Sequence, residues 1–205
     1  MDTYSIIWMV KFMNYPTGTG KVKKQTNYAN RGMGLEHDLN DSNLYYLDHD
    51  KAIIYKKPTP ITISKVDYPS RLEAVIKEAY FKTPSTTDYN GIYRGKYIDF
   101  EAKETKLSSF PISNIHKHQI KHLEKIINHG GIGFIIFRFI VQNKTYLLEG
   151  YKLIDFIENS NRKSIPFSYF EENAHIIKEK YQPRLEYLSV VDSVFFKGEE
   201  IWKNL

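Results

Sequence analysis

One segment of this 205-residue chain limits the fold more than any other: residues 131–141 are almost entirely apolar. Arg138 is the single charged side chain within the segment. The segment is much shorter than the ~20 residues that cross a bilayer. A short, continuous apolar run is typical of a strand that is buried on both faces. We therefore expect a central strand here, with other elements packed on both of its sides, and no membrane partner.

The patterns before and after this segment predict an α/β fold. Helices are expected at residues 33–47, 116–127, 153–159, 169–180 and 187–196. Strands are expected at residues 52–55, in a hairpin and strand over 92–103 that turns at Arg94-Gly95, and at 145–148. Residues 74–81 are apolar without a decisive period, and residues 86–91 have the composition of a turn. This order of elements predicts a mixed central sheet flanked by helices.

Two segments stand apart within this pattern. Residues 1–29 have no sustained period and contain Gly, Pro and Lys residues, so we expect a flexible basic N-terminal arm. Residues 56–69 contain three prolines, which exclude a helix, while Ile61 and Ile63 favour an extended chain. We expect this second segment to project as an arm from a domain that spans residues 30–205.

The distribution of charge favours an anionic partner. The net charge is +5 and the pI is about 9.1. Residues 1–35 and residues 51–71 each carry five basic residues against one aspartate. Such segments suit the phosphates of a nucleic acid, although a basic surface that only confers solubility would give the same counts. The candidate DNA contacts are Arg31, Lys56, Lys57, Lys65 and Arg71.

These candidate contacts have simpler alternatives. Arg31 could pair with a carboxylate instead of DNA, and Lys56-Lys57 could form a solvated turn. The position of the two lysines at the root of a proline-stiffened arm favours phosphate contact.

Several classes of chemistry are excluded by the sequence. The chain has no cysteine, so disulfides, thiolate nucleophiles and Cys-ligated metal sites are absent. The phosphate-binding motif G-x-x-x-x-G-K-[ST] and the motifs G-x-G-x-x-G and G-x-S-x-G do not occur. The first ten residues lack a basic region and a small-residue cleavage site, so we expect no signal peptide and a cytoplasmic protein.

The sequence Tyr97-Ile-Asp-Phe-Glu-Ala-Lys103 carries the clearest chemical signal. Side chains on a strand alternate between two faces, so Asp99, Glu101 and Lys103 share the face opposite Phe100. Asp88 precedes this strand in the spacing Asp-x₁₂-Glu-x-Lys. Two carboxylates can hold Mg²⁺, which lowers the pKa of a bound water, and an ammonium group stabilises negative charge on a phosphate. The pattern therefore predicts phosphodiester hydrolysis by Asp88, Glu101 and Lys103.

Each element of this pattern also has a structural interpretation. An amphipathic strand with Glu and Lys on its solvent face is common, and Asp99 could be an outer support of the site or exposed. Gln119 could cap a helix. His118 and His122 have the i, i+4 spacing of a zinc pair, but no third ligand pattern accompanies them.

Longer stretches make a family resemblance visible. The matching stretches are residues 30–33, 56–60, 75–82, 85–93 and 97–106, with weaker matches at 110–111, 116, 118–120 and 183–184. In these stretches the chain resembles the RecU family of Holliday junction resolvases, within the PD-(D/E)xK nuclease superfamily. The likeness covers residues 30 to about 190.

The resemblance implies a restriction-endonuclease-like core in a mushroom-shaped homodimer, with residues 56–69 as a stalk that enters four-way junction DNA. It implies that Asp88 and Glu101 bind Mg²⁺, with Mn²⁺ as a substitute, and that Lys103 stabilises the transition state. Thr86 and Gln119 would complete the metal shell. Glu36 matches the first-helix glutamate of many nucleases in the superfamily.

The sequence leaves three functions to compare. The first is a crossover junction endodeoxyribonuclease that makes paired symmetric nicks with 5′-phosphate ends in recombination and repair. The second is a nuclease of the same superfamily that cuts ordinary duplex. The third is a DNA-binding regulator of the strand-exchange recombinase, a partner that the resemblance also implies for a junction nuclease.

Overall fold

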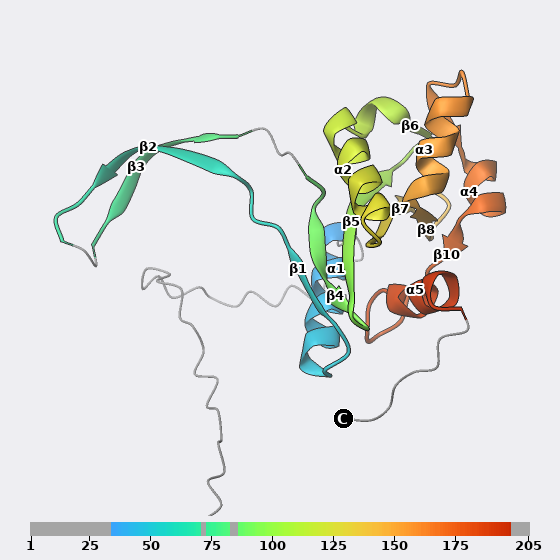
Figure 1. The fold of residues 1–205 in the computed structure, drawn as a ribbon, viewed down its shortest axis with the longest axis horizontal. Coiled ribbons are helices and arrows are strands. Elements are labelled where there is room, and N and C mark those ends of the chain that lie inside the picture. Colours follow the sequence, from blue (N-terminus) through green and yellow to red (C-terminus); the bar gives the residue numbers. More distant parts are fainter. Residues whose placement is uncertain (1–33, 71–72, 83–85, 198–205) are drawn as a thin grey trace, which may run out of the picture. The chain divides into compact units, whose positions relative to one another are not determined.

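The computed structural model describes residues 34–70, 73–82 and 86–197 (Figure 1). Its helices are α1 (Leu35–Asp48), the short 3₁₀ helix η1 (Ile112–Asn114), α2 (Lys117–Asn128), α3 (Gly150–Asn159), α4 (Phe167–Asn173) and α5 (Tyr187–Phe195). Its strands are β1 (Ile53–Lys56), β2 (Ile61–Asp67), β3 (Val75–Phe81), β4 (Tyr89–Tyr93), β5 (Lys96–Thr105), β6 (Ser109–Pro111), β7 (Ile132–Phe139), β8 (Lys144–Glu149), β9 (Ser164–Pro166) and β10 (His175–Ile176). The expected N-terminal arm, Arg31 and Arg71 lie outside the described residues.

A six-stranded sheet forms the centre of the fold, in the order β1-β4-β5-β7-β8-β10. β5 and β7 are parallel and are connected through α2, while the other neighbours are antiparallel. β4 and β5 form a tight hairpin in which Arg94 and Gly95 both have positive φ, 49° and 74°. The predicted mixed sheet with flanking helices, and the turn at Arg94-Gly95, are confirmed.

The apolar character of residues 131–141 follows from the position of β7. Phe134 and Ile136 pack into a core with residues of α1 and α5, whereas Ile135 and Phe137 pack into a second core with residues of α2, α3 and α4. All four side chains have 0% exposure. Because both faces of β7 are buried, apolar residues do not alternate with polar ones along it.

Arg138 is compatible with this central strand because acids surround its guanidinium group. Nη1 lies 2.6 Å from Oδ2 of Asp38, and Nη2 lies 3.2 Å from Oε1 of Glu179. Asp38 also accepts a hydrogen bond from Nε of Arg184 at 3.2 Å. A charge at this depth requires such partners, and the network joins α1, β7 and the segment before α5.

The expected extended arm contains β2, which pairs with β3 in a two-stranded antiparallel ribbon separate from the central sheet (Figure 1). Every residue of both strands is exposed. Residues 74–81 lacked a decisive period in the sequence for this reason: a strand without a buried face has no apolar alternation. The backbone N–H of Lys82 donates to the Pro60 carbonyl at 2.9 Å, which closes the base of the ribbon.

Two local predictions were wrong. The helix expected over residues 169–180 ends at Asn173, because the chain then becomes extended and His175 pairs with Leu147 at the edge of β8. The turn expected over residues 86–91 ends earlier, because Tyr89–Tyr93 pair with β1 and β5. In the described part of the chain, no helix is long and apolar enough to cross a membrane.

Candidate active site

Strand pairing brings Asp88 next to Glu101. Tyr89, the first residue of β4, is opposite Phe100 of β5, so the preceding residue, Asp88, falls beside Glu101. The Asp88 carboxyl is close enough to Glu101 to raise the pKa of Glu101. On the same face of β5, Nζ of Lys103 lies 2.8 Å from Oε1 of Glu101. The structure thus brings the three predicted catalytic side chains together.

The environment of Glu101 favours its protonated form when no metal is bound. Burial, together with the neighbouring Asp88 carboxyl, raises the pKa of Glu101 to about 7 against the opposing effect of Lys103. Glu101 has 0% exposure. Neither of its carboxylate oxygens receives a well-oriented hydrogen bond from any described residue, so the Lys103 contact is an ion pair without good hydrogen-bond alignment.

These orphaned oxygens fit a divalent cation. Buried carboxylate oxygens nearly always have a partner, and a divalent cation held by Glu101 and Asp88 would supply one. No group of three or more acidic or histidine side chains suited to a metal occurs among residues 34–70, 73–82 and 86–197. The two carboxylates would therefore be joined by neutral ligands, as is common for Mg²⁺, which keeps several waters and also binds substrate phosphate.

The two predicted neutral ligands make other contacts in the structure. Thr86 donates its hydroxyl hydrogen to the Thr87 carbonyl at 3.3 Å. Gln119 is buried, and its Oε1 accepts a hydrogen bond from the His116 backbone N–H at 3.0 Å, at the start of α2. This is the capping role that the sequence left open. Metal ligation by Thr86 and Gln119 stays a prediction.

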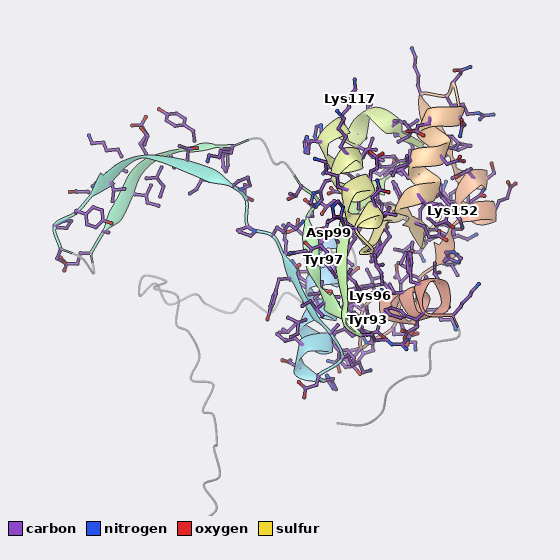
Figure 2. The ribbon with its side chains drawn as sticks, in the orientation of Figure 1. Tyr93, Lys96, Tyr97, Asp99, Lys117 and Lys152 are labelled. Carbon is purple, nitrogen blue, oxygen red and sulfur yellow. The ribbon has the colours of Figure 1, made fainter. Side chains whose placement is uncertain are left out.

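A second polar cluster surrounds Asp99, which the sequence placed either behind the site or in solvent. Asp99 is fully buried. Its Oδ2 lies 2.7 Å from Nζ of Lys57 and 3.2 Å from Nε2 of His122. The same oxygen accepts a hydrogen bond from the hydroxyl of Tyr97 at 3.0 Å, and Figure 2 labels Tyr97 and Asp99. The Thr87 hydroxyl donates to Oδ1. Asp99 is therefore an interior anion, not a surface residue.

The candidate DNA contacts have different environments. The ammonium group of Lys57 faces Asp99, and its side chain is 19% exposed. Lys56 forms an ion pair with Glu36 at the surface, and Lys65 is exposed on β2. Contact of these residues with DNA stays a prediction, and Lys56 and Lys65 are more accessible to a phosphate than Lys57.

His122 belongs to the Asp99 cluster, because its Nε2 lies 3.2 Å from Oδ2 of Asp99. The ring of His118 stacks on His116, with centroids 5.3 Å apart. Sequence reasoning missed the pairing of Lys57 with Asp99. The position of Asp99, two residues before Glu101, could have indicated that Asp99 lies beside the site. Lys57 lies 42 residues from Asp99 in the chain, so no local pattern connects these two residues.

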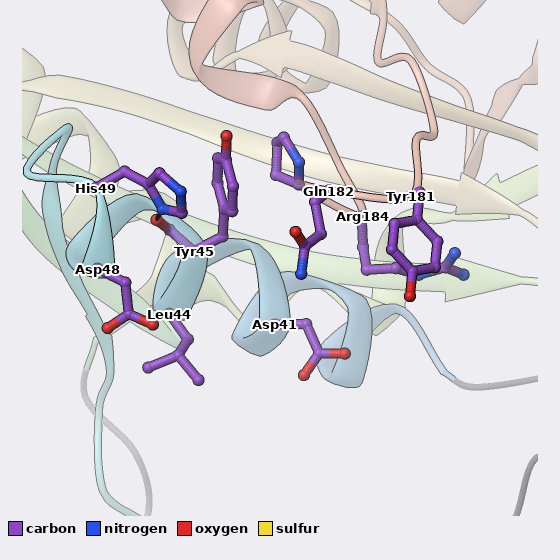
Figure 3. Close-up of a pocket in the computed structure, with 9 residues that line it drawn as sticks. Asp41, Leu44, Tyr45, Asp48, His49, Tyr181, Gln182 and Arg184 are labelled. Atoms are coloured by element: carbon purple, nitrogen blue, oxygen red, sulfur yellow. Dashed lines mark hydrogen bonds between the residues drawn. The ribbon is translucent and has the colours of Figure 1, made fainter.

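Asp88 also borders a cavity of about 240 Å³, which is lined by Gly34, Leu35, Glu36, Tyr89, Ala102 and Glu104. A larger cavity of about 380 Å³ lies between α1 and residues 181–184 (Figure 3). Its lining includes Asp41, Tyr45 and Arg184 but none of the predicted catalytic residues. The predicted catalytic residues therefore lie at the start of β4, beside Asp88, and not at the larger cavity.

The chain is similar to known proteins over most of its length. The family model described as "Recombination protein U" matches residues 30–193. The protein named Holliday junction resolvase RecU from Geobacillus sp. (strain WCH70) is 58% identical over 176 residues, which cover 84% of this chain and 88% of that protein. The protein of the same name from Geobacillus thermodenitrificans is 58% identical over 174 residues, 83% of this chain and 87% of that protein.

Among solved structures, that of the Holliday junction resolvase Hjc from Archaeoglobus fulgidus matches with a TM-score of 0.42 and 11% identity, over 68% of this chain and 92% of that chain. The sequence matches show the family, because they extend over most of the chain and the relatives are more than half identical. The chain belongs to the RecU family.

Proposed function

We propose that this protein is a metal-dependent endonuclease that resolves Holliday junctions, the four-way DNA intermediates of recombination and repair. The observation that carries the proposal is the convergence of Asp88, Glu101 and Lys103 at one end of the β4–β5 pair. Relatives of this chain that are more than 50% identical are named Holliday junction resolvases. The product would be a nicked strand with 5′-phosphate and 3′-hydroxyl ends.

Each residue of the site has a defined task in this mechanism. Bound between Asp88 and Glu101, Mg²⁺, or Mn²⁺ in its place, would lower the pKa of a water and neutralise phosphate charge. Asp88 and Glu101 are the residues that would hold the ion. Lys103 places a positive charge beside Glu101, where it can stabilise the additional negative charge on the phosphorus oxygens during attack.

The β2–β3 ribbon favours a junction over linear duplex as the substrate. It exposes large apolar side chains on both strands, including Tyr80 at 59% and Phe81 at 84% exposure. Apolar groups exposed to this extent mark a binding surface, and they suit the unstacked bases of an open junction better than the phosphates outside a duplex. Lys56 and Lys65, together with Arg31 and Arg71, would contact the DNA backbone.

A homodimer would explain how both strands are cut. A four-way junction has two-fold symmetry, so two related subunits present their sites to two symmetric phosphates. We also propose a cytoplasmic location and a recombinase partner, in keeping with the role of the family in recombination. Analytical ultracentrifugation of the full chain, alone and with a junction, tests the dimer.

The direct test of the function is cleavage of a synthetic four-way junction by the Asp88→Asn variant. We expect Mg²⁺-dependent paired nicking by the native chain and none by the variant, with junction binding in Ca²⁺ retained. Continued cleavage by a folded Asp88→Asn protein would refute the site. Cleavage of linear duplex at the same rate as the junction would favour the general nuclease, and binding without products in either ion would favour the non-enzymatic regulator.

A further inference from the structure

The loop that carries Asp88 is attached to the base of the ribbon by residues outside the catalytic set. The ribbon leaves the sheet after Lys56, the last residue of β1, and the chain returns through residues 82–88 to enter β4. Lys57, at the outgoing end, donates its backbone N–H to the Asp88 carbonyl at 2.7 Å. The outgoing and returning chains are thus connected directly at Asp88.

Side chains reinforce this connection. Nζ of Lys57 donates to Oγ1 of Thr87 at 3.0 Å and lies 2.7 Å from Oδ2 of Asp99. The Thr87 hydroxyl in turn donates to Oδ1 of Asp99. Thr87 is 3% exposed and Asp99 is 0% exposed, so water does not compete for these contacts. The three residues form a closed triangle in which every polar atom has a partner.

The triangle is held rigidly by the rest of the fold. Asp99 lies on β5 two residues before Glu101, on the same face of the strand. The hydroxyl of Tyr97 from β5 also donates to Oδ2 of Asp99, and Nε2 of His122 from α2 lies 3.2 Å from the same oxygen. Thr87 precedes Asp88 in the chain, so a fixed Thr87 restricts where the Asp88 carboxyl can lie relative to Glu101.

We propose that Lys57, Thr87 and Asp99 are positioning residues that attach the base of the β2–β3 ribbon to the Asp88 loop and thereby set the separation of Asp88 and Glu101. The inference rests on the proposed function of that carboxylate pair. It gives Lys57 an interior structural role in place of the phosphate contact expected from its charge. A ribbon held in the required orientation by the DNA would leave Asp88 in place, whereas a displaced ribbon would pull Lys57 and the loop with it.

The test uses Thr87→Val, which keeps the shape of the side chain and the Lys57–Asp99 ion pair but removes the bridging hydroxyl. Thr87→Ser keeps the hydroxyl and serves as the conservative variant. The matched control is Thr145→Val, because Thr145 is also buried and its Oγ1 accepts a hydrogen bond from Nε of Arg138, in a network away from the site.

Three measurements separate positioning from general damage. Single-turnover cleavage of a four-way junction over a range of Mg²⁺ concentrations gives the rate and the half-saturating metal concentration. Electron paramagnetic resonance of free Mn²⁺ measures metal binding without DNA or catalysis. Junction binding in Ca²⁺, together with thermal unfolding, reports affinity and fold.

We expect Thr87→Val to lower the cleavage rate and raise the half-saturating metal concentration by roughly tenfold each, the effect of losing one or two buried hydrogen bonds to charged groups. Junction binding in Ca²⁺ should change by less than about threefold, because the ribbon itself is intact. Thr87→Ser should have a cleavage rate and a half-saturating metal concentration close to the native values. Thr145→Val should leave the half-saturating metal concentration unchanged.

Lys57→Met breaks the same triangle from the other side and provides a second test should Thr87→Val fail to fold. Lys57→Met should lower the cleavage rate and raise the half-saturating metal concentration about as much as Thr87→Val does. In the double variant, each of these changes should be smaller than the product of the changes in the two single variants. Weaker junction binding with a lower salt dependence, and unchanged metal dependence, would instead identify Lys57 as a phosphate contact and overturn its assignment.

Asp88→Asn distinguishes failure of this inference from failure of the proposed function. If Asp88→Asn is inactive while Thr87→Val cleaves and binds Mn²⁺ like the native chain, the positioning role is wrong and the site stands. If Asp88→Asn also cleaves normally, the carboxylate pair is not the catalytic centre, and both proposals fail.

Discussion

Nζ of Lys103 lies 2.8 Å from Oε1 of Glu101, two residues earlier on the same face of β5. A lysine so close to a buried carboxylate compensates part of its charge before a metal arrives. The ammonium group is also fixed beside the position where a phosphate would meet the ion. This contact therefore links the pKa of Glu101 to the chemistry expected at the site.

Replacing Lys103 by Met should therefore lower the single-turnover cleavage rate by about 10²–10³-fold, the usual effect of removing one preorganised charge from a transition state. Junction binding in Ca²⁺ should stay close to native, since one ammonium is a small part of the DNA contact. Lys106→Met removes an exposed lysine three residues further along and is the control. Equal rates for the two variants would exclude a catalytic role for Lys103.

The raised pKa of Glu101 predicts a pH dependence of metal binding. Burial, with help from Asp88, raises this pKa from 4.5 to about 7. Below that pH a proton competes with the ion, so the apparent affinity for Mn²⁺ should decrease about tenfold per pH unit. Titrations of the DNA-free protein between about pH 5.5 and 8 measure this slope, and an affinity independent of pH over this range would contradict it.

The same pKa predicts how Glu101 affects stability. The folded protein binds this proton more tightly than the unfolded chain does, so the free energy of unfolding should decrease as the pH rises from about 4.5 to 7. Glu101→Gln removes the buried charge and should stabilise the metal-free protein near pH 8 by about 1–3 kcal/mol. Urea unfolding of the native chain and of Glu101→Gln at about pH 8 and about pH 4.5 measures this difference. At the lower pH the substitution should change the free energy of unfolding very little.

Replacing residues 61–81 by an Asn-Gly turn between Pro60 and Lys82 tests the ribbon. All residues of β2 and β3 are exposed, so the thermal unfolding temperature should change little. Junction affinity should decrease more than tenfold, while binding of linear duplex should be affected much less. The Lys57–Asp99 contact stays outside the deleted segment, so a loss of duplex cleavage would show that the deletion had also damaged the catalytic site.

The ion-pair network around Asp38 should control stability but not catalysis. Asp38→Ala leaves the guanidinium groups of Arg138 and Arg184 without their shared carboxylate, and Arg138 is only 12% exposed. We expect a loss of about 3–5 kcal/mol in the free energy of unfolding. Asp41→Ala removes an exposed partner of His37 and should cost less than about 0.5 kcal/mol. The metal concentration needed for cleavage should be the same in both variants at a temperature where both are folded.

Local sequence patterns determined much of the architecture. The apolar run at residues 131–141 indicated the central strand, because burial on both faces removes alternation, and β7 occupies Ile132–Phe139. The alternation at residues 97–103 placed Glu101 and Lys103 on one face, because strand geometry alone sets that period. The spacing Asp-x₁₂-Glu-x-Lys made Asp88 a candidate, and the resemblance of several stretches to one family supported its assignment with Glu101.

Only the tertiary structure decided the contacts between distant segments. β2 pairs with β3, although residues 74–81 showed no clear period in the sequence. Lys57 faces Asp99, although its charge suggested a DNA contact. Gln119 caps α2, one of the two roles that the sequence left open for it. Periodicity reports which face of an element is buried, and it contains no information about which other element covers that face. A lysine that looks like a phosphate contact in the sequence becomes an interior cation because a buried aspartate, 42 residues away, needs a partner.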